Sequence, residues 1–234
     1  MNSQPRLNLI YANMRALCEA PQMMMRYANI PYSYNMVWDF YKKPWKEIKN
    51  SIYFNKIPIL IIDDNEYIWQ SNTIIRYLSK LTNTLPEDPF LSAYADSIFE
   101  STHEMFVPLN PTVNIYIGDT FLSNKENLLS NTFPKAFINF ESLMEKFDGD
   151  FFLGKKPFYC DFNAYHYFSL ALLLDKNILS DYPLLLKFME SFHKLKNIKD
   201  YLINRPQLID IGVSPKFIIN KKNIPTGINP NKKY

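Results

Sequence analysis

The sequence predicts an α/β domain followed by an all-helical domain. Before residue 82, short apolar segments that suit strands alternate with segments whose apolar residues recur at helical spacing. A stretch with two prolines and no periodicity follows, and most of the chain after it has helical spacing. We therefore expect four parts: an α/β domain (1–82), a linker (83–90), a helical domain (91–206) and a C-terminal tail (207–234).

Length and composition indicate an ordinary globular protein without a nucleic-acid or membrane partner. The chain has 234 residues, of which 47% are hydrophobic and 21% charged, a balance that can fill a core. Its 26 basic and 23 acidic residues leave a net charge of +3, which is too small to indicate nucleic-acid binding. The longest apolar run, 168–174, is far shorter than the roughly 20 residues of a membrane span.

The cysteine content suits a reducing compartment. Cys18 and Cys160 lie far apart and form no C-x-x-C pair, so they do not indicate a disulfide framework. The N-terminus has no apolar segment of signal-peptide length, and we expect a cytoplasmic protein. Cys18 stands near a helix N-terminus, which could lower its pKa, but we favour a buried thiol without a chemical role.

The segment from Lys56 to Leu81 has the clearest local pattern in the chain. An apolar strand is expected at 57–62, a turn at 63–65 and a second strand at 66–69. A helix then begins at Ser71, because the apolar residues after it lie on one helical face: Ile74, Ile75, Leu78 and Leu81.

Two features of this segment suggest a binding site for an anion. Pro58 stands at the start of the strand, where a cis bond after Ile57 would turn the Ile57 backbone outward. Gln70 and Ser71 mark the change from strand to helix, where free N–H groups and the positive end of the helix dipole can bind a carboxylate. The structural alternative, in which Pro58 only turns the chain and Ser71 only caps the helix, fits the spacing equally well.

The remainder of the first domain completes a known order of elements. We expect a strand at 7–11, a helix that runs through 23–27, a strand at 31–37 and a short helix at 45–49. Together with the segment 56–81 this gives strand, helix, strand, short helix, hairpin and helix, which is the thioredoxin-like order.

Two motifs in this domain resemble the glutathione transferases, most closely the sigma class. The strand carries K-x-P-x-L at Lys56, Pro58 and Leu60, and the helix opens with the dipeptide Gln70–Ser71. The resemblance covers about residues 6–206 and implies the glutathione transferase fold, with glutathione as the co-substrate. It also implies the residues that bind glutathione: Ile57, Pro58, Gln70 and Ser71.

Tyr11 is the catalytic residue that the same resemblance implies. The text around it, I-Y-A-N-M-R, is similar to Y-F-N-M-R of the sigma class. A tyrosine hydroxyl that donates to the sulfur of glutathione favours the thiolate, which is the nucleophile. Lowering the thiol pKa by about 2 units takes about 2.7 kcal/mol, close to the ~1.5–3 kcal/mol of one charge-assisted hydrogen bond. Apart from the resemblance, Tyr11 is one of 16 tyrosines and could simply pack in the core.

Two positions near Tyr11 depart from the family pattern. The family's glycine after N-M-R is Ala16 here, and the arginine that follows it is Leu17. That arginine usually supports the active site, so its loss affects the expected reaction rate more than glutathione binding. Arg15 is retained, either to support the tyrosine or as a surface charge.

Three further residues are carried over as glutathione ligands. Trp45 and Lys49 lie four apart on one helical face, and in the sigma class the matching pair holds the glycine end of glutathione. Core packing for Trp45 and a solvated charge for Lys49 are the structural alternatives. Glu104 matches an acid that reaches the amino group of glutathione bound to the partner subunit, so the resemblance implies a homodimer.

The acidic residues Asp96, Glu100 and Glu104 share one helical face, where like charges repel. We therefore expect a cation opposite them. Sigma-class proteins have acids at the positions of Glu100 and His103 that can hold a divalent ion. Because His103 replaces one of these acids, we predict no metal site.

Prolines and caps define the other helices of the second domain. Pro108 and Pro111 are expected to end or kink its first helix. The segment 157–175 is apolar on nearly all sides, as expected of a buried central helix, and His166 on it is interpreted as a core residue. The start of this helix resembles a family segment that begins with the capping box S/T-x-x-D. Asp161 matches the Asp of that box. Phe158 replaces the capping Ser or Thr, so a neighbouring group must take over the cap.

The resemblance implies a glutathione transferase that attacks a hydrophobic electrophile or a peroxide with the glutathione thiolate, as in detoxification. The electrophile is expected between Tyr11 and the helix that carries Met105 and Phe106. A narrower enzymatic alternative is an isomerase or peroxidase that acts on prostaglandin-type peroxides. The rival is a non-catalytic ligand-binding or scaffold protein of the same fold, which the changes at Ala16, Leu17 and Phe158 favour. The tail 207–234 is either loosely ordered or folded back over the electrophile site.

Overall fold

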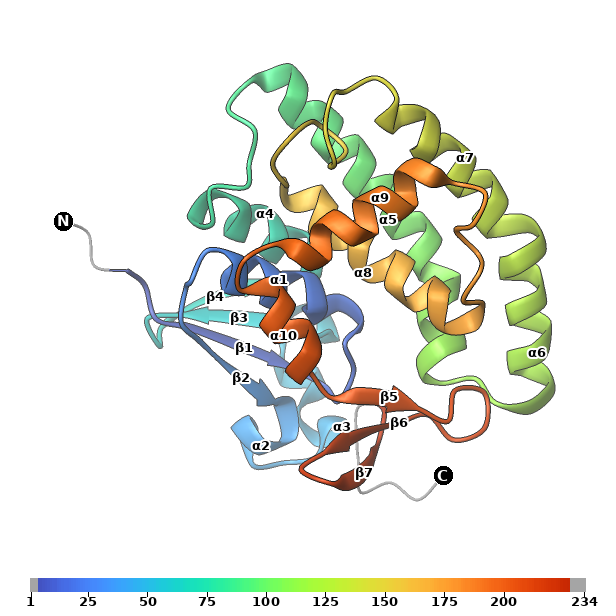
Figure 1. The fold of residues 1–234 in the computed structure, drawn as a ribbon. Coiled ribbons are helices and arrows are strands. Elements are labelled where there is room, and N and C mark those ends of the chain that lie inside the picture. The colour runs from blue at the N-terminus through green and yellow to red at the C-terminus, as the bar shows by residue number, and fades with distance from the viewer. Residues whose placement is uncertain (1–3, 228–234) are drawn as a thin grey trace.

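A four-stranded mixed sheet forms the centre of the N-terminal domain in the computed structural model, which describes residues 4–227 (Figure 1). The strand order is β2-β1-β3-β4. The central strand β1 is parallel to β2 and antiparallel to β3, and β3 forms a hairpin with β4. The strands are β1 (Leu7–Tyr11), β2 (Tyr32–Met36), β3 (Ile59–Ile62) and β4 (Glu66–Trp69).

Helices cover both faces of this sheet, because successive side chains of a strand point to opposite faces. Leu9 and Leu60 pack on the side of α1 (Glu19–Tyr27) and α4 (Ser71–Leu81), within the main core. On the other face, a second cluster forms against α2 (Val37–Tyr41) and α3 (Trp45–Ile48), and its buried members are Ile10, Val37, Ile48, Ile52, Ile59 and Ile61. The predicted thioredoxin-like order is confirmed, and α2 is an element that the sequence did not predict.

The C-terminal domain is a helical bundle around one buried helix (Figure 1). Its helices are α5 (Pro89–Asn114), α6 (Gly118–Asn127), α7 (Phe133–Met144), α8 (Tyr159–Leu174), α9 (Pro183–Lys194) and α10 (Ile198–Asn204). As predicted, α8 is buried along nearly its whole length, and His166 on it is completely buried. None of the helices within 4–227 has the length and apolar character needed to cross a membrane.

Of the two outcomes expected at its prolines, an end or a kink, helix α5 does not show the first. The helix continues through Pro108 and Pro111 to Asn114. Each proline removes one N–H that would bond the carbonyl four residues earlier, at Glu104 and Val107. Both of these residues are exposed, so water can satisfy the freed carbonyls.

Backbone and carboxylate groups replace the missing side-chain cap of α8. Phe158 has no acceptor in its side chain, but its carbonyl accepts the Asp161 N–H at 3.0 Å. The buried Asp161 carboxylate accepts the N–H groups of Phe158 (2.8 Å) and Phe152 (2.9 Å). The expected compensation for the lost Ser or Thr is therefore confirmed.

Residues 207–227 form ordered structure rather than a loose tail. They form a three-stranded antiparallel sheet of β5 (Gln207–Ile209), β6 (Lys216–Ile219) and β7 (Lys222–Pro225), here called the C-terminal sheet. Figure 1 shows it beyond the end of α10, near the start of α6. The remainder of the predicted tail, 228–234, lies outside the described residues.

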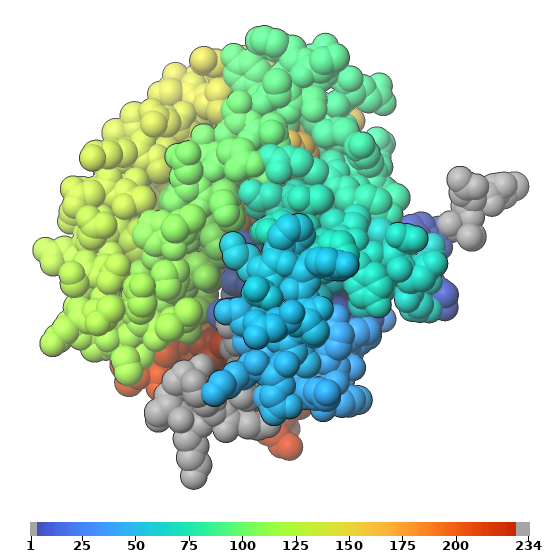
Figure 2. All heavy atoms as spheres, turned by 180° about the vertical axis from the view of Figure 1, so that it is seen from behind, coloured from blue at the N-terminus to red at the C-terminus, as the bar shows by residue number. Residues whose placement is uncertain are grey.

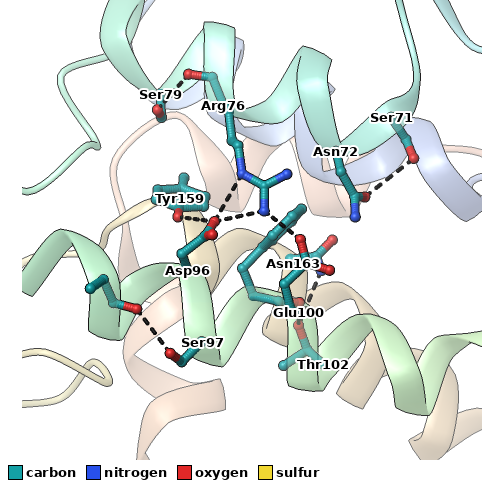
Figure 3. Close-up of polar contacts among 12 residues, drawn as sticks. Ser71, Asn72, Arg76, Ser79, Asp96, Ser97, Glu100, Thr102, Tyr159 and Asn163 are labelled. Carbon is teal, nitrogen blue, oxygen red and sulfur yellow. Dashed lines mark hydrogen bonds and ion pairs between the residues drawn. The ribbon is translucent and has the colours of Figure 1, made fainter.

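One arginine joins the two domains, and it is the cation expected opposite the acidic face of α5 (Figure 3). Arg76 on α4 donates from Nε to Asp96 at 2.9 Å and forms an ion pair with Glu100. Asp96 also accepts the hydroxyl of Tyr159 from α8 at 2.9 Å. Three helices of the two domains thus meet at this polar cluster.

We expect Arg76→Gln to lower the free energy of unfolding by about 1 kcal/mol, because the charge-assisted bonds are partly exposed and screened by solvent. The side chains of Arg76, Asp96 and Glu100 are 39%, 45% and 48% exposed. Arg6→Gln is the matched control, since Arg6 and its partner Asp64 are 74% and 73% exposed. Urea unfolding of the two variants measures the difference. If Arg76→Gln and Arg6→Gln lowered the free energy of unfolding equally, the contacts of Arg76 between the domains would not contribute to stability.

Candidate active site

A cavity of about 300 Å³ lies between the two domains, where the N-terminus of α4 faces α5. Figure 2 shows a hollow here, between the bright-blue residues that precede β3 and the green residues of α5, with darker blue atoms of the N-terminal segment at its floor. The cavity is lined by Leu17, Lys56, Ile57, Pro58, Gln70, Ser71, His103, Phe106 and Val107. Four of the predicted glutathione ligands therefore surround one space.

The N-terminus of α4 forms one end of this cavity. Gln70 has a φ of +70° and precedes the helix, which begins at Ser71 as predicted. The Gln70 carbonyl accepts the first intrahelical bond, from Ile74 N–H at 3.0 Å. The N–H groups of the first turn have no partners within the helix, and the helix dipole adds positive potential, so this end of the cavity suits a carboxylate.

The segment before β3 forms the adjoining wall. The Ile57–Pro58 peptide bond is cis, which is the conformation considered for it from the position of Pro58. Ile57 precedes Ile59, the first residue of β3 that pairs with β1 and β4. A peptide in extended conformation can therefore bond to the Ile57 main chain in the manner of an added strand.

The Tyr11 hydroxyl lies just behind the Leu17 wall. Tyr11 ends β1 and is 3% exposed, and its hydroxyl accepts the Leu17 N–H at 3.5 Å. Burial raises the pKa of Tyr11 above its ordinary value, and the nearby Cys18 thiol acts in the same direction. The hydroxyl is therefore protonated at neutral pH and is able to donate to a sulfur atom.

Helix α5 supplies the opposite wall. His103 stacks on Phe106 with ring centroids 5.7 Å apart, and Phe106 stacks on Tyr167 at 4.3 Å. Burial lowers the pKa of His103, so the ring is neutral at physiological pH. His103 and Val107 were not predicted as cavity residues. His103 lies three residues before Phe106 and four before Val107, and residues at these spacings share one face of a helix. This spacing was the signal in the sequence that could have placed all three on one face of α5.

Four predicted site residues do not line this cavity: Tyr11, which reaches it only through its bond to Leu17, and Trp45, Lys49 and Glu104. Trp45 is half-buried and packs against the second core cluster, and Lys49 is exposed. Glu104 is exposed and, with Met105, lines a separate groove of about 720 Å³ between α5 and α7. Met105, which was expected beside the electrophile, thus faces the other side of α5 from Phe106.

Comparisons with known proteins agree with this fold. Residues 16–81 match the family model of the glutathione S-transferase N-terminal domain, and residues 111–205 match that of the C-terminal domain. A glutathione S-transferase of Plasmodium yoelii yoelii is 30% identical over 161 residues, which span 69% of this chain and 74% of the relative. Hematopoietic prostaglandin D synthase of Gallus gallus is 29% identical over 204 residues, which span 87% of this chain and 98% of that protein.

The fold and the family matches together identify the class of protein. The structure of rat hPGDS in complex with a quinoline superposes with a TM-score of 0.76 over 87% of this chain and 98% of its own, at 23% identity, and so shares the fold. The chain belongs to the glutathione S-transferase family of enzymes. The similarity to the avian prostaglandin D synthase over nearly its full length agrees with the predicted resemblance to the sigma class.

Proposed function

We propose that the chain binds glutathione in the cleft between the two domains and ionises its thiol with Tyr11. The observation that carries the proposal is that one cavity joins the N-terminus of α4 to Leu17, whose N–H donates to the Tyr11 hydroxyl. A carboxylate of glutathione lies against Ser71 and Gln70, and its cysteinyl part bonds to the Ile57 main chain beside Pro58. Trp45 and Lys49, outside the lining of the empty cavity, hold the glycine end.

Thiolate formation is the step that Tyr11 promotes. The buried, protonated hydroxyl donates to the sulfur, and the thiol proton passes to water. The thiolate then attacks the electrophilic atom of the second substrate, and as the new bond to sulfur forms, the bond to the leaving group breaks. The leaving group, a halide of an aryl halide or the alkoxide half of a peroxide, departs with the electron pair, and the alkoxide takes a proton from water. No residue has to change its protonation state, because Tyr11 donates throughout.

The second substrate is a hydrophobic electrophile or a peroxide that packs against α5. Phe106 and Val107 present apolar surface to the cavity, and the neutral His103 is a polar group on the same wall. This surface is compatible with a prostaglandin-type peroxide and equally with a general apolar electrophile. Two buried free thiols, Cys18 and Cys160, are consistent with a reducing, cytoplasmic location.

The position of Glu104 supports action as a homodimer. Glu104 lines the α5–α7 groove rather than the cavity of its own chain, so it can reach glutathione only in a second copy. Two exposed aromatic side chains offer apolar surface for a dimer interface, since Tyr53 is 68% exposed and Phe54 is 64% exposed. Both rings pack edge-on to Trp69. An isologous twofold dimer would cover such a surface.

Glutathione titration calorimetry on point variants tests the binding site. We expect Ser71→Ala to weaken binding about tenfold, since one hydrogen bond to a charged group contributes about 1.5 kcal/mol or more. Lys49→Gln and Glu104→Gln, which remove exposed charges, are expected to weaken binding about threefold each. Ser79→Ala is the matched control, because Ser79 lies on the same helix, outside the cavity lining, and its hydroxyl donates to the Arg76 carbonyl. Unchanged binding in Ser71→Ala would place glutathione elsewhere.

A further inference from the structure

The C-terminal sheet lies beyond the part of the chain that the family models match. The C-terminal family model ends at residue 205, and β5 begins at Gln207. The sheet is nevertheless part of the main core, because Leu208 and Phe217 are 7% and 3% exposed and belong to that cluster. The C-terminal sheet also contacts the loop that follows Tyr11.

The residues after β7 pair directly with the loop that follows Tyr11. Asn13 and Gly227 exchange two main-chain hydrogen bonds, of 3.0 Å and 3.2 Å. The Asn13 side-chain nitrogen also donates to the carbonyls of Pro225 at 2.6 Å and Ile224 at 3.3 Å. Asn13 is only 5% exposed, so four hydrogen bonds connect one buried residue of the loop to the C-terminal sheet.

A second residue of the same loop contacts the sheet from its other side. The Arg15 guanidinium donates to the carbonyl of Pro206, immediately before β5. It also lies over the ring of Phe217 in β6, 5.6 Å from the ring centroid. Arg15 therefore contacts the C-terminal sheet and the residue before it, and is not a free surface charge.

The far side of the sheet is fixed to the helical domain. The Thr226 hydroxyl donates to the carbonyl of Asn114 at 2.5 Å, at the end of α5, and lies 3.1 Å from the carbonyl of Pro215. Gly118 N–H, at the start of α6, donates to the carbonyl of Gly212 at 3.0 Å. The sheet thus connects the loop after Tyr11 to the α5–α6 junction.

This loop determines where the Leu17 N–H lies. Leu17 is four residues after Asn13, and its N–H donates to the Tyr11 hydroxyl at 3.5 Å, the long end of the range for a hydrogen bond. A small displacement of the loop would therefore remove it. A phenol oxygen that accepts an N–H is a stronger O–H donor, because successive hydrogen bonds polarise one another.

We propose that the C-terminal sheet, through Asn13, holds the 12–17 loop so that Tyr11 donates more strongly to the glutathione thiolate. Asn13 is then a positioning residue that acts through Leu17 and Tyr11, and Thr226 contributes by fixing the sheet to α5. The inference rests on the proposed role of Tyr11. It assigns a function in catalysis to a segment that the matched family domains do not include.

The test compares Asn13→Ala and Thr226→Val with Asn223→Ala in the full chain. Asn223→Ala is the matched control because Asn223 is exposed on β7. The pKa of the bound glutathione thiol is followed by ultraviolet absorbance of the thiolate, and glutathione affinity is measured by calorimetry. We expect the thiol pKa to rise by about 0.5–1 unit in Asn13→Ala and Thr226→Val, with kcat/KM at acidic pH lower by about three- to tenfold. Affinity for glutathione, measured at pH 5.5 where the bound thiol is mostly protonated, should change less than about twofold in all three variants, since the α4 site is untouched.

The outcomes separate this inference from the proposed function. The role of the sheet would be overturned if the thiol pKa rose in Tyr11→Phe but stayed unchanged in Asn13→Ala and Thr226→Val. The role of Tyr11 would then remain intact. An unchanged pKa in Tyr11→Phe would overturn the role of Tyr11 itself. A loss of glutathione affinity in parallel with the pKa change would indicate general unfolding of the site and would also contradict the positioning role.

Discussion

Tyr11→Phe is expected to reduce kcat/KM for glutathione conjugation about 100-fold at neutral pH. The variant removes the hydroxyl that we propose donates to the sulfur, and the ~2–3 kcal/mol of a charge-assisted hydrogen bond corresponds to about two units of thiol pKa. Since the thiolate is the nucleophile, Tyr11→Phe is slower than the original protein in proportion to its smaller thiolate fraction. This difference persists until the pH approaches the pKa of the free thiol. Steady-state kinetics with 1-chloro-2,4-dinitrobenzene between pH 6 and 9 measure the effect.

The pH dependence distinguishes loss of the hydroxyl from loss of structure. The deficit of Tyr11→Phe should shrink as the pH rises, because hydroxide then ionises the thiol without help from the protein. Tyr77→Phe is a matched control on α4, where the side chain is half-buried and lies outside the cavity lining. A deficit that stays constant from pH 6 to 9 would contradict thiolate stabilisation by Tyr11.

Asp161→Ala is expected to lower the free energy of unfolding by about 3 kcal/mol, which is a large fraction of the stability of a typical domain. The carboxylate is completely buried and accepts two main-chain N–H groups, from Phe152 and Phe158. Alanine leaves both donors buried without a partner, and each such group costs about 1–3 kcal/mol. Urea unfolding followed by circular dichroism measures the change.

Two further variants test the cause of this loss. Burial raises the pKa of Asp161 to about 7, against the opposing effect of the two N–H donors, so an uncharged amide is a close substitute at neutral pH. Asp161→Asn should therefore lose only about half as much stability as Asp161→Ala, because it keeps one acceptor oxygen. Asp181→Ala, at an exposed position, should stay within about 0.5 kcal/mol of the original protein. If Asp161→Ala lowered the free energy of unfolding as little as Asp181→Ala, Asp161 would not stabilise the start of α8.

Local sequence signals predicted the elements around the cleft with good accuracy. The hairpin and helix from Ile57 to Leu81 follow from the turn residues, the position of Pro58 and the helical spacing after Ser71, all within one short segment. The acidic face of α5 likewise implied a cation, and Arg76 is that cation. In each case the physical cause lies within a few residues or on one helical face.

Features that depend on distant contacts could not be predicted in the same way. The prolines of α5 imply an end or a kink, and packing against α8 and solvent access to two carbonyls allow the helix to continue through them. The C-terminal sheet is bonded to Asn13 through Ile224 and Pro225, which are more than 200 positions away in the sequence. The cavity walls contributed by His103 and Val107 also appear only when α5 is placed against the first domain.

The central claim is that the chain binds glutathione and ionises its thiol with Tyr11. Ultraviolet titration of the thiolate in the glutathione complex, for the original protein and for Tyr11→Phe, tests it most directly. We expect a bound thiol pKa about two units below that of free glutathione in the original protein, and a value near the free one in Tyr11→Phe. A complex that forms with an unshifted thiol pKa in both proteins would contradict the claim and favour a glutathione-binding protein without catalysis.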